Sequence, residues 1–132
     1  MKVDHLAETI ISALEDIKAR DIVNLDVSSI TSLFEKIIIA SADSSRQTRA
    51  LANNVIEQVK NAGGEIYGIE GEQLGEWILV DCGDVIVHIM QPAVRQYYNL
   101  EELWGGRLPI PFKKQGEPIQ AKQVSEGSRW GT

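Results

Sequence analysis

The segment Trp77–Met90 constrains the fold of this 132-residue chain more strongly than any other. It consists of two apolar, largely β-branched runs on either side of Cys82 and Gly83, a pattern that predicts a β-hairpin turning at these two residues. Residues that face each other across such a hairpin share a face of the sheet. With the turn placed there, Asp81 lies opposite Asp84. The hairpin therefore has two chemically different faces.

One predicted face is wholly β-branched and belongs to the core, and it comprises Ile78, Val80, Val85 and Val87. The other combines large apolar groups with two carboxylates and an imidazole, and it comprises Trp77, Leu79, Asp81, Asp84, Ile86 and His88. In one interpretation a helix covers Leu79 and Ile86 while the polar groups point into solvent. In the other the face is exposed for docking, because a Trp in an apolar patch rimmed by charge typically anchors protein interfaces. Both interpretations can hold in part.

Helical spacing of apolar residues predicts three helices. The first two have the stripes Leu6, Ile10, Ala13, Leu14, Ile17 and Leu51, Ala52, Val55, Ile56, Val59. The third begins at Pro92 and has the stripe Ala93, Tyr97, Leu100, Trp104.

Strands are predicted at residues 22–27, 33–40 and 65–69. The continuous run Ile37–Ile39 indicates a strand that is covered on both faces. Because a helix connects residues 33–40 to residues 65–69, a right-handed βαβ unit with parallel pairing of these two strands is expected. With the hairpin, the fold class is α/β: a single domain of about five strands and three helices.

Composition divides the chain after Trp104. Residues 1–104 contain 8 Lys and Arg against 17 Asp and Glu, whereas residues 105–132 contain 5 against 2. The second part is rich in Gly, Pro, Gln and Lys and has no apolar period, so we predict a domain at 1–104 and a flexible basic tail at 105–132. Because affinity for nucleic acid depends on Lys and Arg, little direct nucleic-acid binding is expected of the acidic domain, and a basic protein is its expected partner.

Several classes of function are disfavoured. There is no apolar run long enough to span a membrane, which predicts a cytoplasmic protein, and the single Cys82 fits a small hydrophobic position better than a disulfide or metal site. Asp81, Asp84 and His88 could in principle bind a divalent metal, but carboxylates that flank a Gly turn are at least as common as turn formers. No cofactor is expected.

Catalytic and anion-binding motifs are equally weak. His5 lies on the solvent side of the first helix, the serines 41, 44 and 45 suit helix capping, and no P-loop or GxGxxG order occurs. Arg46 and Arg49 oppose the dipole of the second helix, so they serve either a partner or solvation.

Three blocks of the chain resemble the Iojap, or ribosomal silencing factor, family. They are Ser41–Gln47 after the Ile-rich strand, Ile69–Gly71 followed by Trp77–His88, and Tyr97–Trp104, in the family's order and spacing. The resemblance covers roughly residues 3–104 and leaves the tail outside it.

The resemblance implies a mixed-sheet α/β fold related to nucleotidyltransferases. This sequence departs from the pattern that nucleotidyltransferase chemistry needs, because it has no Gly-Ser helix start followed by an Asp-x-Asp pair on a strand. It implies a non-enzymatic protein that binds ribosomal protein uL14 on the large ribosomal subunit, blocks the small subunit and represses translation under nutrient limitation. It also implies a homodimer when free. The expected docking residues are Trp77, Leu79, Asp81, Asp84, Ile86 and His88, with Tyr97 and Tyr98 as a further candidate pair. The alternative is a nucleotidyltransferase-like or metal-dependent enzyme that uses Asp81, Asp84 and His88.

Overall fold

The computed structural model describes residues 1–104. The chain divides into two compact units, Met1–Tyr98 and a second unit that begins at Asn99. The first contains the whole sheet and helices α1–α3, and the second contains the short helix α4 (Leu100–Trp104). The predicted tail at 105–132 lies outside the described residues.

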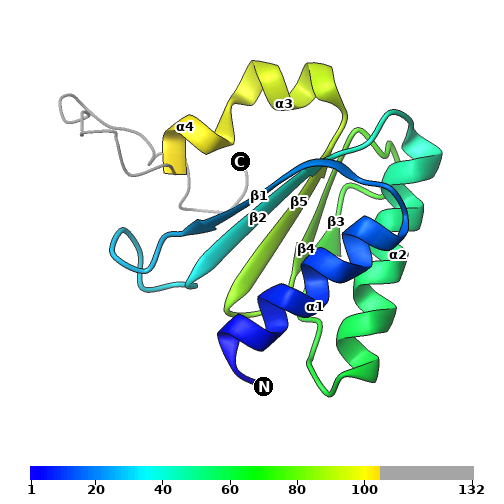
Figure 1. Cartoon of the computed structure of the whole chain (residues 1–132). Helices are drawn as coiled ribbons and strands as arrows, with labels where there is room; N and C mark the ends of the chain where they lie inside the picture. The colour runs from blue at the N-terminus through cyan, green and yellow to red at the C-terminus, as the bar shows by residue number, and fades with distance from the viewer. Residues whose placement is uncertain (105–132) are drawn as a thin grey trace, which may run out of the picture. The chain divides into compact units, whose positions relative to one another are not determined.

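The sheet has five strands: β1 (Arg20–Asp26), β2 (Lys36–Ser41), β3 (Gly68–Glu70), β4 (Trp77–Asp81) and β5 (Val85–Met90). Their order across the sheet is β1-β2-β5-β4-β3 (Figure 1). Strands β2 and β5 pair in parallel, and the other pairs are antiparallel. The predicted α/β fold with a mixed five-stranded sheet is confirmed.

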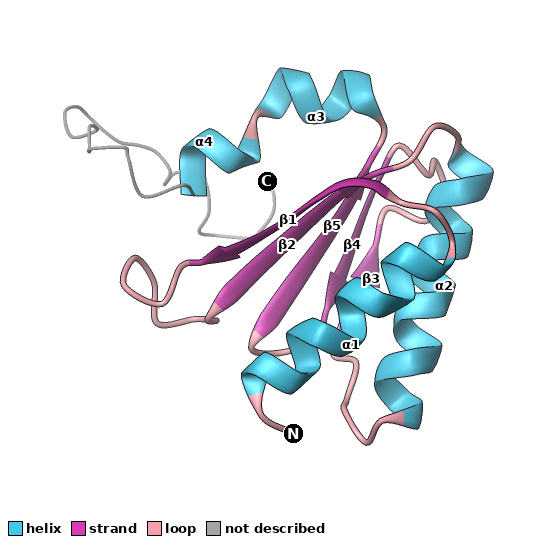
Figure 2. Cartoon of the chain, in the orientation of Figure 1, coloured by secondary structure: helices cyan, strands magenta, loops and turns pink. Residues whose placement is uncertain are grey.

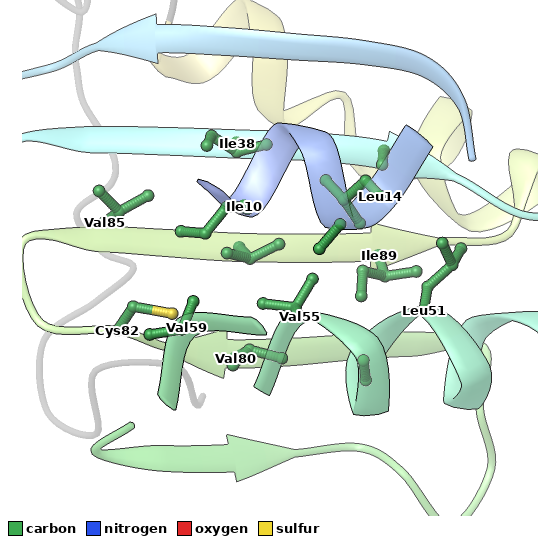
Figure 3. Packing of buried hydrophobic residues seen from close by; sticks show 14 of the residues in the cluster. Ile10, Leu14, Ile38, Leu51, Val55, Val59, Val80, Cys82, Val85 and Ile89 are labelled. Carbon is green, nitrogen blue, oxygen red and sulfur yellow. The ribbon is translucent and has the colours of Figure 1, made fainter. Parts of the chain in front are cut away.

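Helices α1 (Val3–Asp16) and α2 (Ser45–Asn61) cover one face of this sheet (Figure 2). Their stripes meet apolar side chains of the strands in one cluster, seen in Figure 3 for Ile10, Leu14, Ile38, Leu51, Val55, Val59, Val80, Cys82, Val85 and Ile89. Burial of this apolar surface is the main force that holds the helices on the sheet.

The beginning of α2 is capped and tied to the end of α1. The Ser44 hydroxyl accepts the Gln47 backbone N–H at 3.1 Å, as in a Ser N-cap. The Gln47 side-chain amide donates to the carbonyls of Ile17 and Lys18 at 3.1 and 3.2 Å. Gln47, whose backbone N–H the cap accepts, therefore also ties the start of α2 to the segment that follows α1.

The run Ile37–Ile39 is fully buried, which confirms that β2 is covered on both faces. Helix α3 (Pro92–Tyr98) lies on the side of the sheet opposite α1 and α2 (Figure 2). It is held there by Arg95, which is buried and donates to the Ser41 hydroxyl of β2 at 2.7 Å.

The expected parallel pairing within the βαβ unit is wrong. Strand β3 runs in the same direction as β2, but β5 and β4 lie between them. Because β5 is the strand that pairs with β2, the β4–β5 hairpin lies between β2 and β3, and β3 forms the edge of the sheet.

Two local predictions are also corrected. The hairpin turns at Gly83 and Asp84, not at Cys82 and Gly83, because the Cys82 N–H donates to the Val85 carbonyl and Gly83 takes a φ of +88° that favours glycine. The third helix is broken into α3 and α4 at Asn99, whose φ of +50° ends the helical path. The described residues thus contain four helices where three were predicted.

Candidate docking face

The hairpin keeps its two predicted faces although its register differs. Moving the turn by one residue shifts every cross-strand partner by two, so that Asp81 pairs with Ile86 and Leu79 pairs with His88. An even shift returns each side chain to the same side of the sheet. Ile78, Val80, Val85 and Val87 are completely buried beneath α1 and α2, which confirms the predicted core face.

The other face is only partly exposed. Leu79 is 5% exposed, and Ile86 and His88 are completely buried. Trp77 and Asp81 are half-buried, and Asp84 is exposed. A partner can therefore reach Trp77, Asp81 and Asp84, whereas Leu79, Ile86 and His88 lie beneath the surface in this structure.

The aromatic patch, defined here as Trp77, Tyr97 and Tyr98, is the main exposed feature of this face. The ring centroids of Trp77 and Tyr98 are 4.8 Å apart at an angle of 47°, and those of Tyr97 and Tyr98 are 4.9 Å apart and edge to face. Tyr97 is 81% exposed and Tyr98 53%. Rings in tilted and edge-to-face contact have less conformational freedom than isolated rings, so they lose less entropy on binding a partner.

His88 supports the patch from inside. The Trp77 indole N–H donates to Nδ1 of His88 at 2.9 Å, and the two ring centroids are 5.9 Å apart. Burial lowers the pKa of His88 to about 3, so the imidazole is neutral at physiological pH. A neutral ring whose Nδ1 accepts a hydrogen bond carries its proton on Nε2.

The two carboxylates of the turn do not form a metal site with this histidine. One Asp81 carboxylate oxygen accepts the Gly83 N–H at 2.9 Å, the pattern of an Asx turn. Within residues 1–104, no group of three or more His, Cys, Asp and Glu side chains is placed to hold a metal ion. The geometry therefore gives no support to the alternative in which Asp81, Asp84 and His88 ligate a metal.

Cys82 is also unsuited to chemistry. It is buried, and desolvation, helped by the nearby charge of Asp81, raises the pKa of its thiol to about 12. The thiol therefore stays protonated at neutral pH and behaves as a small apolar side chain.

The loop that leads into Trp77 is held by side chains of α2. Arg49 donates to the carbonyls of Glu72 and Gln73 at 2.8 and 2.6 Å. The hydroxyls of Ser45 and Thr48 donate to the next two carbonyls, at 2.9 and 2.6 Å. Four consecutive carbonyls of residues 72–75 are thus fixed by one helix.

Gly71 allows this loop to pass close to β4. Its φ is +88°, and a Cβ at this position would lie 2.1 Å from the carbonyl oxygen of Trp77. Only glycine fits such a contact, so residue 71 helps to place the backbone of Trp77.

An acidic hollow lies beside the aromatic patch. It is an open depression lined by Ile69, Glu70, Gly71, Glu72, Gln73, Leu74, Glu76 and Trp77. The side chains of Glu70, Glu72 and Glu76 are exposed, and Leu74 is 74% exposed on the loop. A surface that combines aromatic rings, an apolar side chain and carboxylates suits a partner with Lys or Arg side chains, which pair with carboxylates and stack on rings.

Some of these residues were not recognisable from the sequence. Arg49, which the sequence assigns either to a partner or to solvation, also ties α2 to the loop by donating to the carbonyls of Glu72 and Gln73. Likewise Thr48, Gln91 and Arg95 act through contacts with distant segments. No periodicity or motif marks such contacts, because they depend on how α2, α3 and the loop meet in space.

In the part of the chain that the structure describes, no helix is both long and apolar enough to traverse a lipid bilayer.

Comparisons with known proteins agree with the blocks found in the sequence. Residues 1–130 match the model of the family described as ribosomal silencing factor during starvation, so the match continues past Trp104. Ribosomal silencing factor RsfS of Chromobacterium violaceum is 54% identical over 109 residues, covering 83% of this chain and 89% of that protein.

More distant and structural relatives extend this agreement. A mouse protein named mitochondrial assembly of ribosomal large subunit protein 1 is 29% identical over 131 residues, covering 93% of this chain and 56% of the mouse protein. A crystal structure of a Chromobacterium violaceum protein, 54% identical, superposes with a TM-score of 0.79 over 83% of this chain and 91% of that one. The chain therefore belongs to the Iojap, or ribosomal silencing factor, family.

Proposed function

We propose that this protein binds the large ribosomal subunit through ribosomal protein uL14, occupies the surface where the small subunit joins, and thereby represses translation under nutrient limitation. It acts by steric exclusion and not as an enzyme. The observation that carries the proposal is the exposed aromatic patch of Trp77, Tyr97 and Tyr98 beside an acidic hollow.

Two further observations support a basic partner on the large subunit. Residues 1–104 have a net charge of −9, which repels RNA and attracts a basic ribosomal protein. The mouse relative is named for the assembly of the large ribosomal subunit. The identity of uL14, the exclusion of the small subunit and a homodimeric free state follow from the family resemblance.

Cosedimentation with separated ribosomal subunits tests the proposal. The protein should pellet with the large subunit and stay in the supernatant with the small one, and rising salt should weaken binding because charge attraction is screened. Tyr97→Ala, within the patch, should reduce the pelleted fraction. Leu33→Ala removes a side chain that is 70% exposed in the loop between β1 and β2, so it is the matched control and should bind normally. Pelleting with the small subunit alone would refute the proposal.

A homodimer is tested separately by sedimentation equilibrium of the free protein. A mass near twice 14.6 kDa is expected at micromolar concentration. A monomer at every concentration would refute the homodimer and leave the proposed binding to the large subunit unaffected.

A further inference from the structure

His88 is a polar side chain placed inside an apolar layer. It is completely buried, and its in-register neighbours are Leu79 on β4 and Ile39 on β2. An imidazole costs free energy in such a place unless it is hydrogen-bonded, and an aliphatic side chain of similar size would fill the volume without that cost. Packing alone therefore does not explain a histidine here.

The histidine makes a specific contact with the aromatic patch. Trp77 lies diagonally across the β4–β5 pair, because His88 is in register with Leu79 and Trp77 with Met90. The indole crosses this diagonal and donates to Nδ1 of His88 at 2.9 Å. Nδ1 is available as an acceptor because burial keeps the imidazole neutral, with its pKa lowered to about 3.

This contact selects one orientation of the indole. An indole on a half-exposed strand end has several accessible rotamers, and a hydrogen bond at one edge restricts it to those that bring Nε1 over His88. In that orientation the ring meets Tyr98 at 4.8 Å. Two contacts thus orient the Trp77 side chain: the hydrogen bond to His88 on β5 and the ring contact with Tyr98 on α3.

We propose that His88 is a positioning residue for docking: it accepts the Trp77 indole N–H and so pre-orders the aromatic patch in the arrangement that the large-subunit partner recognises. This inference rests on the proposed function, because it assigns His88 a role in presenting the same patch. The residue itself does not touch the partner. Pre-ordering raises affinity by removing the entropy that the indole would otherwise lose on binding.

Two substitutions separate positioning from filling of space. His88→Leu keeps a side chain of similar volume and removes the acceptor. His88→Asn is smaller, but its amide oxygen reaches the position of Nδ1 and can accept the same indole N–H. A residue that only fills space is replaced better by Leu, whereas a positioning acceptor is replaced better by Asn.

The first readout is the indole N–H resonance of Trp77 in 15N-tryptophan-labelled protein, assigned with Trp77→Phe. In His88→Leu this resonance should shift and exchange faster with water, and in His88→Asn it should stay close to its original position. The second readout is cosedimentation with the large subunit. His88→Leu should weaken binding about five- to tenfold, the size of one lost hydrogen bond, and His88→Asn should restore most of it.

Trp77→Phe keeps the test decisive if His88→Leu folds poorly, and where both variants fold they are combined in a double-mutant cycle. Trp77→Phe retains a ring beside Tyr98 and removes the N–H donor. It should weaken binding by a factor similar to that of His88→Leu, and the double variant should bind no worse than either single one. Additive losses in the cycle would overturn the proposal, as would normal binding by a folded His88→Leu protein.

The indole resonance distinguishes this failure from failure of the proposed function. If the wild-type protein does not pellet with the large subunit, the proposed function fails whatever the resonance shows. If the resonance responds to His88→Leu as expected but Trp77→Ala binds the large subunit normally, the patch is not the docking site, so the positioning role falls while large-subunit binding stands. If Trp77→Ala loses binding while His88→Leu does not, only the positioning role is overturned.

Discussion

At the scale of single residues, the hairpin places two neighbours in the sequence in opposite environments. Ile78 is buried between the sheet and the helices, whereas Trp77 reaches the surface and contacts Tyr98. This difference follows from the alternation of side chains along β4. It means that adjacent substitutions in one strand should have unlike consequences, and that the two faces can be tested separately.

Trp77→Ala should reduce affinity for the large subunit more than it reduces stability. Loss of a central aromatic anchor costs about 2 kcal/mol or more of binding free energy, roughly a thirtyfold change in Kd. The measurement is cosedimentation over a range of protein concentrations, with chemical denaturation of the same variant. If the variant is largely unfolded while its folded fraction binds normally, Trp77 is a core residue and the docking face lies elsewhere.

Val87→Ala should show the opposite pattern. Val87 is completely buried in the cluster against α1 and α2, so its truncation should lower the free energy of unfolding by about 1–3 kcal/mol. Affinity per folded molecule should be unchanged, because the side chain lies on the face away from the patch. A binding defect without a loss of stability would contradict the assignment of faces.

The buried imidazole of His88 also makes a prediction about pH. Its pKa is lowered to about 3 in the folded protein and is near 6.5 in an unfolded chain, so only the unfolded state takes up a proton as the pH falls between these values. This uptake should reduce the free energy of unfolding by about 2–3 kcal/mol between pH 7 and pH 4.5.

Denaturation curves of wild type and His88→Asn over this range provide the check. Between pH 7 and pH 4.5, the free energy of unfolding of the wild type should fall by about 2–3 kcal/mol more than that of His88→Asn, because the variant lacks the group that titrates. Asp26, whose pKa is lowered by its hydrogen bonds to Ser28, also loses stabilising contacts in acid, but only below about pH 4, the ordinary range for Asp. Equal pH dependence in both proteins would show that His88 is solvated.

At the scale of elements, α2 and the loop before β4 form one supporting unit. Arg49, Ser45 and Thr48 fix four consecutive carbonyls of the loop, and Gly71 lets its backbone pass against the carbonyl of Trp77. Helix α2, which covers the core, therefore also helps to position Trp77 of the aromatic patch.

Gly71→Ala should test this unit. The new Cβ meets the Trp77 carbonyl and sits at a positive φ, so the loop must move, at a cost of about 1–3 kcal/mol, and large-subunit binding should weaken. Gly68→Ala is the control, because a Cβ at that position meets nothing within 4 Å and its φ is not positive. Similar behaviour of the two variants, by thermal unfolding and cosedimentation, would show that the close approach at Gly71 is unimportant.

The elements could be predicted from the sequence to the extent that they depend on local patterns. The stripes of α1 and α2, the doubly covered run Ile37–Ile39 and the two faces of the hairpin all follow from periodicity, and the structure confirms them. The position of the turn was missed because Cys82-Gly83 and Gly83-Asp84 are both reasonable turns, and the difference lies in one backbone hydrogen bond from Cys82 to Val85.

Features that depend on tertiary contacts were not predictable. Strand order was missed because the pairing of β2 with β5 competes with that of β2 and β3, and local pattern does not decide between them. Residue type and the family blocks predict Trp77 and the two tyrosines as docking candidates. The burial of Leu79, Ile86 and His88, and the hydrogen bond that joins His88 to Trp77, required the assembled sheet.

At the scale of the whole molecule, charge and shape have different tasks. In the proposed mode of binding, the net charge of −9 over residues 1–104 attracts basic surfaces at a distance and disfavours RNA, while the aromatic patch provides contact area at short range. Steric exclusion needs nothing more than tight occupancy of the joining surface. We therefore expect one bound molecule to prevent subunit association.

Subunit joining measured on sucrose gradients tests this steric exclusion. Large subunits are incubated with excess protein before small subunits and Mg²⁺ are added, with Leu33→Ala as the matched control for Trp77→Ala. We predict that wild type and Leu33→Ala leave the subunits separate, whereas Trp77→Ala allows them to join. Normal formation of joined ribosomes that still carry the wild-type protein would refute steric exclusion.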